Sequence, residues 1–154
     1  MLSLKTSKIA DTETIWHLRN DVATRRELGL KLISYSECLD WVANIVEGKS
    51  KETLLIAKDD KLGIVGFVTL QYDNDVAHIG VSIGSAFRGR GYGQHTIKLA
   101  TEYEMGLTRP MNRRLLAHIR SENYKALFAF ESAGYKEIGM DKQEQHEYFI
   151  YEYK

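Results

Sequence analysis

The sequence predicts a mixed α/β (α+β) fold, in which a central sheet of about six to seven strands is flanked by about four helices on both faces. Short strand-like runs alternate along the chain with amphipathic stretches of helical period. Three consecutive strand-like runs are separated only by short turns, which indicates an antiparallel meander. The third of these runs leads through a glycine-rich turn into a helix and a further strand, which is the order of a crossover unit.

The chain is expected to begin with a strand and a helix. Residues 2–8 alternate between apolar and polar side chains, as a strand with one buried face does. Asp11 is placed to cap a helix. The apolar face of this helix carries Ile15, Leu18 and Val22, at the spacing of helical turns.

A second helix follows after an ambiguous segment at residues 25–33. Ser34 and Glu37 have the spacing of a capping box, in which each side chain satisfies a backbone N–H group of the other. Gly48 ends the apolar periodicity that follows. A helix over about residues 34–47 is therefore expected.

The middle of the chain is expected to form the meander. Its three strands are predicted at residues 53–57, 64–72 and 76–84. Turns are expected at Asp59-Asp60-Lys61 and at Asp73-Asn74, because these residue types favour tight turns.

The last third is expected to alternate helix and strand. A helix is predicted from about Gln94 to Leu107, and Pro110 marks where the chain leaves it. The remaining elements are predicted as a strand at residues 115–120, a helix at 123–133, and closing strands at 135–139 and 148–153.

Composition limits the possible partners. The chain has 154 residues, 21 basic and 21 acidic side chains and one cysteine, which predicts one domain over residues 1–154. The balanced charge gives no electrostatic reason to expect nucleic acid or a membrane surface. No apolar run approaches the roughly 20 residues of a membrane span, and the lone Cys38 allows no internal disulfide, so we expect a cytoplasmic protein. The histidines lack metal-ligand spacing, so we expect no metal.

Residues 88–93, Arg-Gly-Arg-Gly-Tyr-Gly, lie between a predicted strand and a predicted helix. Backbone N–H groups of such a turn and the positive end of the helix dipole can bind a phosphate or pyrophosphate. Glycines also serve purely structural turns, and this spacing is not that of a Rossmann fingerprint. The turn alone leaves both interpretations open.

Three local patterns resemble those of the GNAT family of N-acetyltransferases. They are Val81-Ser82-Ile83 followed by the segment Phe87 to Gly93, then Asn123-Tyr124-Lys125-Ala126, and then Ala133-Gly134-Tyr135-Lys136. With the order of predicted elements, the resemblance covers nearly the whole chain. It implies an enzyme that uses acetyl-coenzyme A as co-substrate and acetylates an amine.

The resemblance also implies cofactor contacts. Backbone groups of Val81 and Ile83 pair with the pantetheine arm, because the strand that carries them diverges from the strand after the next helix. Asn123 bonds near the thiol end, although it is equally suited to cap a helix, and Phe130 packs against the arm or the core. The pyrophosphate is held by the turn formed by Arg88, Gly89, Arg90, Gly91, Tyr92 and Gly93.

His78 is the candidate catalytic base. Related acetyltransferases often have glutamate at the like position, and strand alternation places His78, Gly80 and Ser82 on one face. An imidazole can exchange protons at neutral pH. A half-buried histidine with a backbone partner is the structural alternative, and His118 is a weaker candidate.

The proton donor departs from the family's pattern. Many members have a tyrosine where this chain has Phe130, which has no proton to donate. Tyr124 and Tyr135 are the candidate replacements, together with water.

Acceptor choice in this fold comes from the N-terminal helices. The Arg-Asn-Asp opening and the later Ser-x-x-Glu-x-x-x-Trp helix resemble acetyltransferases of nucleotide-linked amino sugars, and also ribosomal-protein N-terminal acetyltransferases. Arg19, Arg25 and Trp41 are therefore candidate substrate-binding residues, with a solvated helix face and an aromatic core as the alternative. We expect a small-molecule amine as acceptor and a monomer or homodimer. A coenzyme A-binding module without turnover and a domain that binds another nucleotide are the competing hypotheses.

Overall fold

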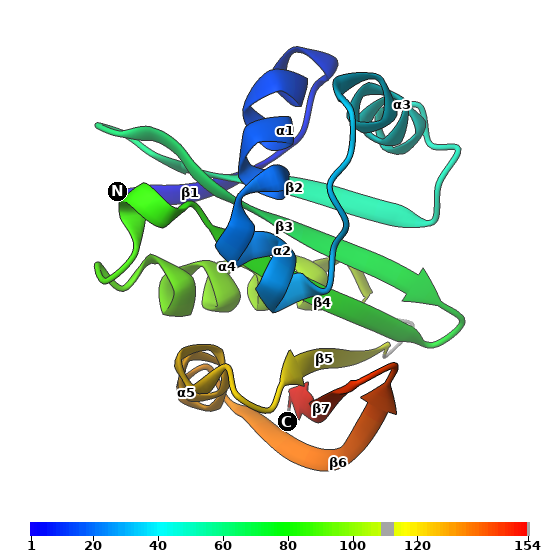
Figure 1. Cartoon of the computed structure of the whole chain (residues 1–154), viewed down its shortest axis with the longest axis vertical. Helices are drawn as coiled ribbons and strands as arrows, with labels where there is room; N and C mark the ends of the chain where they lie inside the picture. The colour runs from blue at the N-terminus through cyan, green and yellow to red at the C-terminus, as the bar shows by residue number, and fades with distance from the viewer. Residues whose placement is uncertain (109–112, 154) are drawn as a thin grey trace.

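The computed structural model describes residues 1–108 and 113–153, and the predicted helix exit at Pro110 lies outside them. The described residues form a seven-stranded sheet in the order β1-β2-β3-β4-β5-β7-β6 (Figure 1). The strands are β1 (Leu2–Thr6), β2 (Glu52–Asp59), β3 (Gly63–Asp73), β4 (Val76–Ile83), β5 (Arg114–Arg120), β6 (Tyr135–Gln143) and β7 (His146–Tyr153). Neighbours are antiparallel except β4 and β5, which are parallel. The predicted mixed sheet is confirmed.

The described residues contain five α-helices. They are α1 (Thr12–Asn20), α2 (Val22–Leu28), α3 (Tyr35–Val46), α4 (Tyr92–Thr108) and α5 (Tyr124–Ser132). The predicted capping box of α3 is confirmed, since Ser34 and Glu37 exchange their side-chain hydrogen bonds with backbone N–H groups. No helix in residues 1–108 or 113–153 is long and apolar enough to cross a bilayer.

The helix expected to carry Ile15, Leu18 and Val22 is broken at Asp21. This residue has ψ of 134°, and its carboxylate accepts the Thr24 N–H at 3.2 Å, so it caps a separate helix. That helix, α2, occupies part of the ambiguous segment and adds one helix to the number expected. Asp11 lies at the N-terminus of α1, but its carboxylate accepts the N–H of Lys8 rather than one of the helix.

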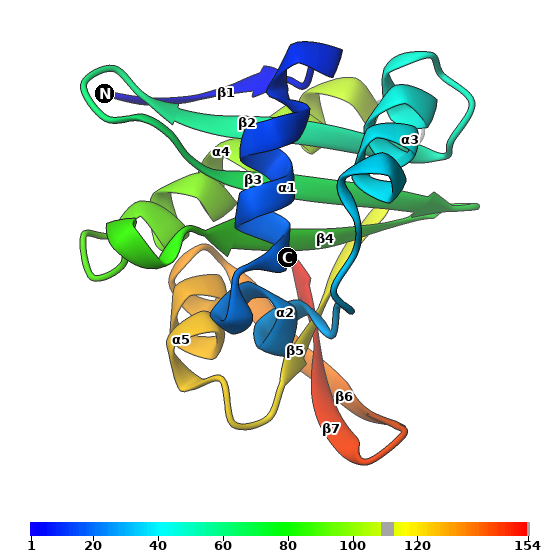
Figure 2. The ribbon, with the colours of Figure 1, turned by 45° about the horizontal axis from the view of Figure 1, so that its top comes forward.

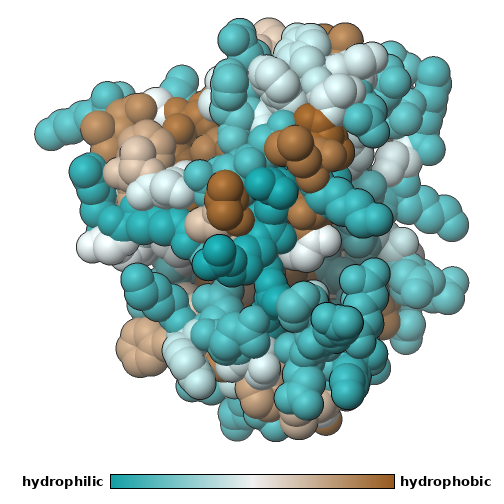
Figure 3. All heavy atoms as spheres, viewed as in Figure 1, coloured by the Kyte–Doolittle hydropathy of each residue, from teal (hydrophilic) through white to brown (hydrophobic). Residues whose placement is uncertain are grey.

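Different helices cover the two faces of the sheet. Leu54, Ile56 and Phe67 pack with buried residues of α1 and α3, including Cys38. Alternate strand residues such as Leu55 pack with buried residues of α4 and α5. Figures 1 and 2 show α1, α2 and α3 in front of the first four strands and α4 behind them. Figure 3 shows that hydrophilic residues predominate on the front face, with apolar residues in separate patches.

The strands β4 and β5 stay together over only part of their length. Their pairing in the described chain consists of Val76 with Arg114, Ala77 with Leu115 and His78 with Leu116. β4 continues to pair with β3 up to Ile83, while β5 turns away (Figure 1). The second half of β4 therefore presents an open backbone edge toward β5, as the sequence comparison with the family implied.

Candidate active site

The turn between β4 and α4 exposes its backbone. Gly89 and Gly91 have φ of +78° and +80°, a left-handed conformation that glycine adopts without strain. A Cβ built on Gly89, Gly91 or Gly93 meets no atom within 4 Å. The space over all three glycines is open, so a ligand can approach the backbone closely.

The first turn of α4 adds N–H groups to this region. The His95 N–H donates to the Gly91 carbonyl at 3.2 Å, so the N–H groups of the preceding helical residues have no carbonyl partner within the helix. These groups carry the positive end of the helix dipole. A cavity of about 240 Å³ is lined by Gly91, Gln94, His95 and Lys98. The turn therefore fits an anionic group such as a pyrophosphate.

Two side chains of this turn, those of Arg88 and Tyr92, are hydrogen-bonded to carboxylates elsewhere in the chain. The Arg88 guanidinium forms a bidentate ion pair with Glu27 of α2, and its Nε donates to the Ile83 carbonyl at 3.2 Å. The Tyr92 hydroxyl donates to Asp59 at 3.0 Å, and Arg90 is exposed. These two side chains are therefore already engaged, while the backbone of the three glycines borders open space.

Helix α2 is fastened to the strand and turn that precede α4 by three side-chain pairs, which we call the α2 latch. The pairs are Thr24 with Ser82, Asp21 with Ser85, and Glu27 with Arg88. The two buried hydroxyls of Thr24 and Ser82 lie 2.8 Å apart, and the Ser85 hydroxyl donates to Asp21 at 2.8 Å. The latch fixes the position of α2 over the end of β4.

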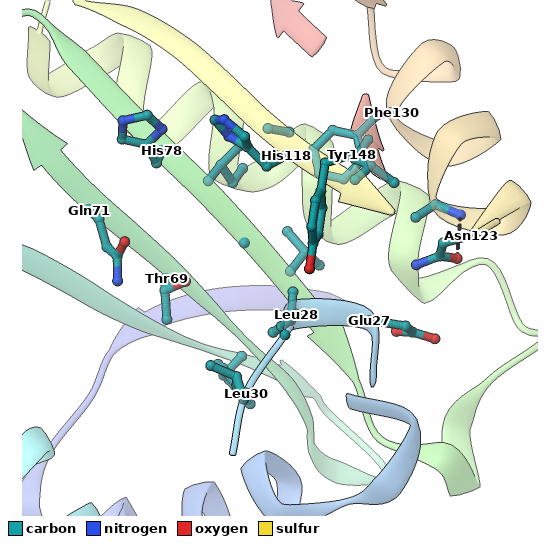
Figure 4. A pocket seen from close by; sticks show the side chains of 18 of the residues that line it. Glu27, Leu28, Leu30, Thr69, Gln71, His78, His118, Asn123, Phe130 and Tyr148 are labelled. Atoms are coloured by element: carbon teal, nitrogen blue, oxygen red, sulfur yellow. Dashed lines mark hydrogen bonds between the residues drawn. The ribbon is translucent and has the colours of Figure 1, made fainter. Parts of the chain in front are cut away.

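A pocket of about 680 Å³ lies under α2 and extends to the point where β4 and β5 separate (Figure 4). Polar side chains from nine helices and strands line it. They are Arg19 of α1, Glu27 of α2, Trp41 of α3, Glu52 of β2, Thr69 and Gln71 of β3, His78 of β4, His118 of β5, Gln143 of β6 and Tyr148 of β7. Asn123, the residue before α5, completes the polar lining. Val81 and Phe130 also line the pocket, so it is continuous with the open edge of β4.

His78 and His118 form a pair in this pocket. Their ring centroids are 5.5 Å apart at an interplanar angle of 47°, and Figure 4 shows both rings beside the diverging strands. Burial of His118, and then the nearby His78, lower the pKa of His118, while Asp141 opposes the shift. The neutral ring, which can accept a proton, is therefore favoured at His118.

The predicted site residues in and around α5 differ in whether they reach the pocket. Asn123 caps the helix by accepting the Ala126 N–H at 3.3 Å and also lines the pocket. Phe130 is 5% exposed and packs edge-on against Tyr135 at 5.0 Å. Tyr124 is 76% exposed and lies outside the pocket lining. The Tyr135 hydroxyl is buried against Thr101, and burial raises its pKa far above the ordinary value.

Tyr148 is the pocket tyrosine that sequence reasoning missed. It lies opposite Arg120 where β7 pairs with β5, and Figure 4 shows its hydroxyl extending toward Leu28. Alternation along a strand places the Tyr148 side chain on one of the two faces of the sheet. Only the pairing of β7 with β5 shows that this face lines the pocket. Glu52 and Gln71 were missed for the same reason, whereas Glu27 was missed because α2 lies in the segment that the sequence left ambiguous.

Two of the three candidate substrate-binding residues meet in the pocket wall. The Arg19 guanidinium lies 4.3 Å above the Trp41 ring, and the Trp41 Nε1–H donates to Glu52 at 3.3 Å. Arg25 is elsewhere, since its Nε donates to the Asn20 carbonyl at 3.2 Å and the residue is absent from the lining.

Comparison with known proteins adds independent information. Residues 2–136 match the family described as "Acetyltransferase (GNAT) domain". The chain is 27% identical to the uncharacterized N-acetyltransferase YfmK of Bacillus subtilis (strain 168) over 117 residues, which are 75% of this chain and 72% of that protein.

Solved structures with the same fold include two acetyltransferases with coenzyme A bound. The spermidine N-acetyltransferase of Vibrio cholerae, in complex with CoA and spermine, has a TM-score of 0.82 and 22% identity over 97% of this chain and 94% of that chain. The aminoglycoside acetyltransferase AAC(6')-Ib, in complex with coenzyme A, has a TM-score of 0.81 and 14% identity over 98% of this chain and 93% of that chain.

Proposed function

The chain belongs to the GNAT family of acetyltransferases, with acetyl-coenzyme A as its co-substrate, and we propose that it transfers the acetyl group to a primary amine of a small molecule by direct attack in a ternary complex. The observation that carries the proposal is the divergence of β4 from β5 beyond His78. It connects the glycine turn, where a pyrophosphate fits, to a polar pocket that contains a histidine pair.

The proposed cofactor contacts follow the open edge of β4. The backbone of Val81 and Ile83 pairs with the amides of the pantetheine arm as a neighbouring strand would. The N–H groups of residues 88–93 hold the pyrophosphate. Asn123 and Phe130, which line the pocket near this edge, contact the thiol end.

His78 is the proposed base. An amine with a pKa near 10 is protonated at neutral pH, and removing its proton costs about 4–5 kcal/mol at pH 7. His78 accepts this proton directly or through water, with the His118 ring beside it at a centroid distance of 5.5 Å. A positioned base contributes about 10² to 10⁴ in rate. The amine nitrogen then attacks the carbonyl carbon, the carbon–sulfur bond breaks, and the thiolate takes up a proton.

We propose Tyr148, rather than the exposed Tyr124, as the protein group that returns this proton. Its hydroxyl extends into the pocket (Figure 4). Phe130 stands where many relatives have a tyrosine, and Tyr148 brings a hydroxyl to the pocket from a different strand. Replacing Tyr148 by Phe is expected to lower kcat while leaving the Kd of acetyl-coenzyme A unchanged.

The proposed acceptor class is a nucleotide-linked amino sugar. The helix pattern that carries Arg19 and Trp41 supports it, and both side chains lie in the pocket wall. Spermidine and aminoglycosides, the molecules named for the two similar structures, are also small amines. An N-terminal amine of a ribosomal protein is the alternative acceptor.

The test is release of the coenzyme A thiol from acetyl-coenzyme A in the presence of amino-sugar nucleotides, simple amines and peptides. We expect turnover with a small amine. The variant His78→Gln should have a lower kcat and an altered pH–rate profile, with an unchanged Kd for acetyl-coenzyme A. Binding of acetyl-coenzyme A without transfer to any amine would contradict the proposal, and an unaltered pH–rate profile would remove His78 as the base.

A further inference from the structure

The Arg19 side chain is a half-buried cation in the wall of the pocket. Its guanidinium carbon lies over the Trp41 ring, 4.3 Å from the ring centroid, an arrangement that favours a cation electrostatically. Its Nε is buried and has no hydrogen-bond partner in residues 1–108 or 113–153. No ion pair joins it to a carboxylate of the described chain. A guanidinium has five donors and no acceptor, and because the Nε is buried, an anion in the pocket would bind at the terminal nitrogen atoms.

The carboxylates that line the same pocket have partners of their own. Glu27 is held in a bidentate pair by Arg88. Glu52 accepts the Trp41 Nε1–H at 3.3 Å and the Ser50 hydroxyl at 3.4 Å. Arg19 therefore has no carboxylate at contact distance in the described chain, although burial lowers its pKa and the charges of Glu52 and Glu37, acting from farther away, oppose this lowering.

The sheet register gives the distance between Arg19's end of the pocket and the histidine pair. Glu52 of β2 lies opposite Gln71 of β3, which lies opposite His78 of β4. Neighbouring strands are ~4.8 Å apart, so the backbones of Glu52 and His78 are on the order of 10 Å apart. Trp41 is bonded to Glu52, and Arg19 covers Trp41. An acceptor that reaches from His78 to Arg19 therefore needs several bonds between its two functional groups.

We propose that Arg19, supported by Trp41, is an anion subsite, and that the acceptor is an amine carrying a carboxylate or phosphate several bonds from its amino group. The inference rests on the proposed function and narrows its substrate class. A polyamine carries only positive charge and meets, at this end of the pocket, a guanidinium that has no ion pair within the described residues. Spermidine, the substrate named for one similar structure, is therefore disfavoured here.

The test uses six-carbon primary amines that differ only at the far end. They are 6-aminohexanoate, 6-aminohexyl phosphate, hexylamine and 1,6-diaminohexane. With saturating acetyl-coenzyme A, kcat/KM for at least one anionic amine should exceed that for hexylamine by about 10- to 100-fold. The phosphate and carboxylate arms identify the anion. The variant Arg19→Gln should remove the preference by raising KM for the anionic amine far more than it raises KM for hexylamine.

Arg26→Gln is the matched control, because Arg26 is exposed and lies outside the pocket lining. It should retain the preference of the wild type. A preference for the diamine, or an equal loss on all four amines in Arg19→Gln, would overturn the anion subsite while leaving the acetyltransferase function intact.

A binding measurement separates the two proposals if none of the amines is acetylated. Thermal unfolding of the protein with coenzyme A is followed with added 6-aminohexyl phosphate, 6-aminohexanoate or hexylamine. Stabilisation by an anionic amine in the wild type that is lost in Arg19→Gln would support the subsite and contradict the proposed turnover of simple amines. No stabilisation by either anionic amine would overturn the subsite.

Discussion

The glycine turn after β4 and the helix α2 lie against each other, but their positions are set in different ways. The turn depends on the backbone conformation of consecutive residues, including Gly89 and Gly91 with positive φ. α2 is held by the latch, whose partners are 58, 61 and 64 residues apart in the chain. The turn is thus encoded locally, and the wall of the acceptor pocket is encoded by contacts between distant segments.

This difference separates the two binding tasks. The turn offers mostly backbone groups, which do not change when side chains change. The proposed acceptor pocket is lined by side chains of α1, α2, α3, α5 and the strands β2 to β7, so single substitutions there can alter acceptor choice. The Glu27–Arg88 pair joins the two regions, since Glu27 lines the pocket and Arg88 begins the turn.

The largest expected effect comes from Gly91→Val. A side chain at this position fills the open space over the turn and strains a backbone with φ of +80°. We expect the Kd of acetyl-coenzyme A to rise about 100-fold, or about 2.7 kcal/mol. Isothermal titration calorimetry measures this change.

Gly48→Val is the matched control for backbone strain. Gly48 has φ of +74°, and a Cβ there also meets no atom within 4 Å, but it follows α3 and is far from the turn in sequence. Both variants should lose about 1–2 kcal/mol of unfolding free energy. Unchanged acetyl-coenzyme A affinity in Gly91→Val, or an equal loss in Gly48→Val, would contradict local encoding of the cofactor turn.

The same contrast explains what the sequence could predict. Strand and helix periodicity, the capping box at Ser34 and the glycine turn are local patterns, and the structure has them at the expected positions. The break at Asp21 was missed because apolar spacing continues across it through Val22. Only the cap that Asp21 provides to Thr24 reveals a separate helix.

The acceptor pocket was predicted less completely for a tertiary reason. His78 was found because its strand leads directly into the glycine turn. Tyr148 and Glu52 enter the pocket through the pairing of β7 with β5 and of β2 with β3, which no single segment reveals. The side chain of Arg88, the first residue of the predicted pyrophosphate turn, is likewise engaged by Glu27, 61 residues away.

A smaller effect is expected from breaking the latch at Thr24→Val. This substitution keeps the shape of a fully buried side chain but leaves the buried Ser82 hydroxyl without its 2.8 Å partner. Such a loss costs about 1–3 kcal/mol of unfolding free energy. The double variant Thr24→Val/Ser82→Ala should recover much of it, because both buried polar groups are then removed.

Chemical denaturation of the wild type, of the single variants Thr24→Val and Ser82→Ala, and of the double variant gives the four free energies of a double-mutant cycle. Strictly additive losses would show that the two hydroxyls do not stabilise each other across the latch. Acetyl-coenzyme A affinity should fall less than tenfold in all three variants, because the backbone of the glycine turn is unchanged.

The smallest expected effect is a pH dependence contributed by His118. Its folded-state pKa is lowered by burial and by His78, so between that value and its unfolded value near 6.5 the unfolded chain binds more protons. The stability of the folded state is then full above about pH 6.5 and falls as the pH is lowered through the folded-state pKa. His118→Gln should flatten this part of the pH–stability curve, whereas substitution of the exposed His17 should leave it. Curves of equal slope for the wild type and His118→Gln would show that burial in the pocket does not lower the pKa of His118 and would contradict a desolvated pocket at this position.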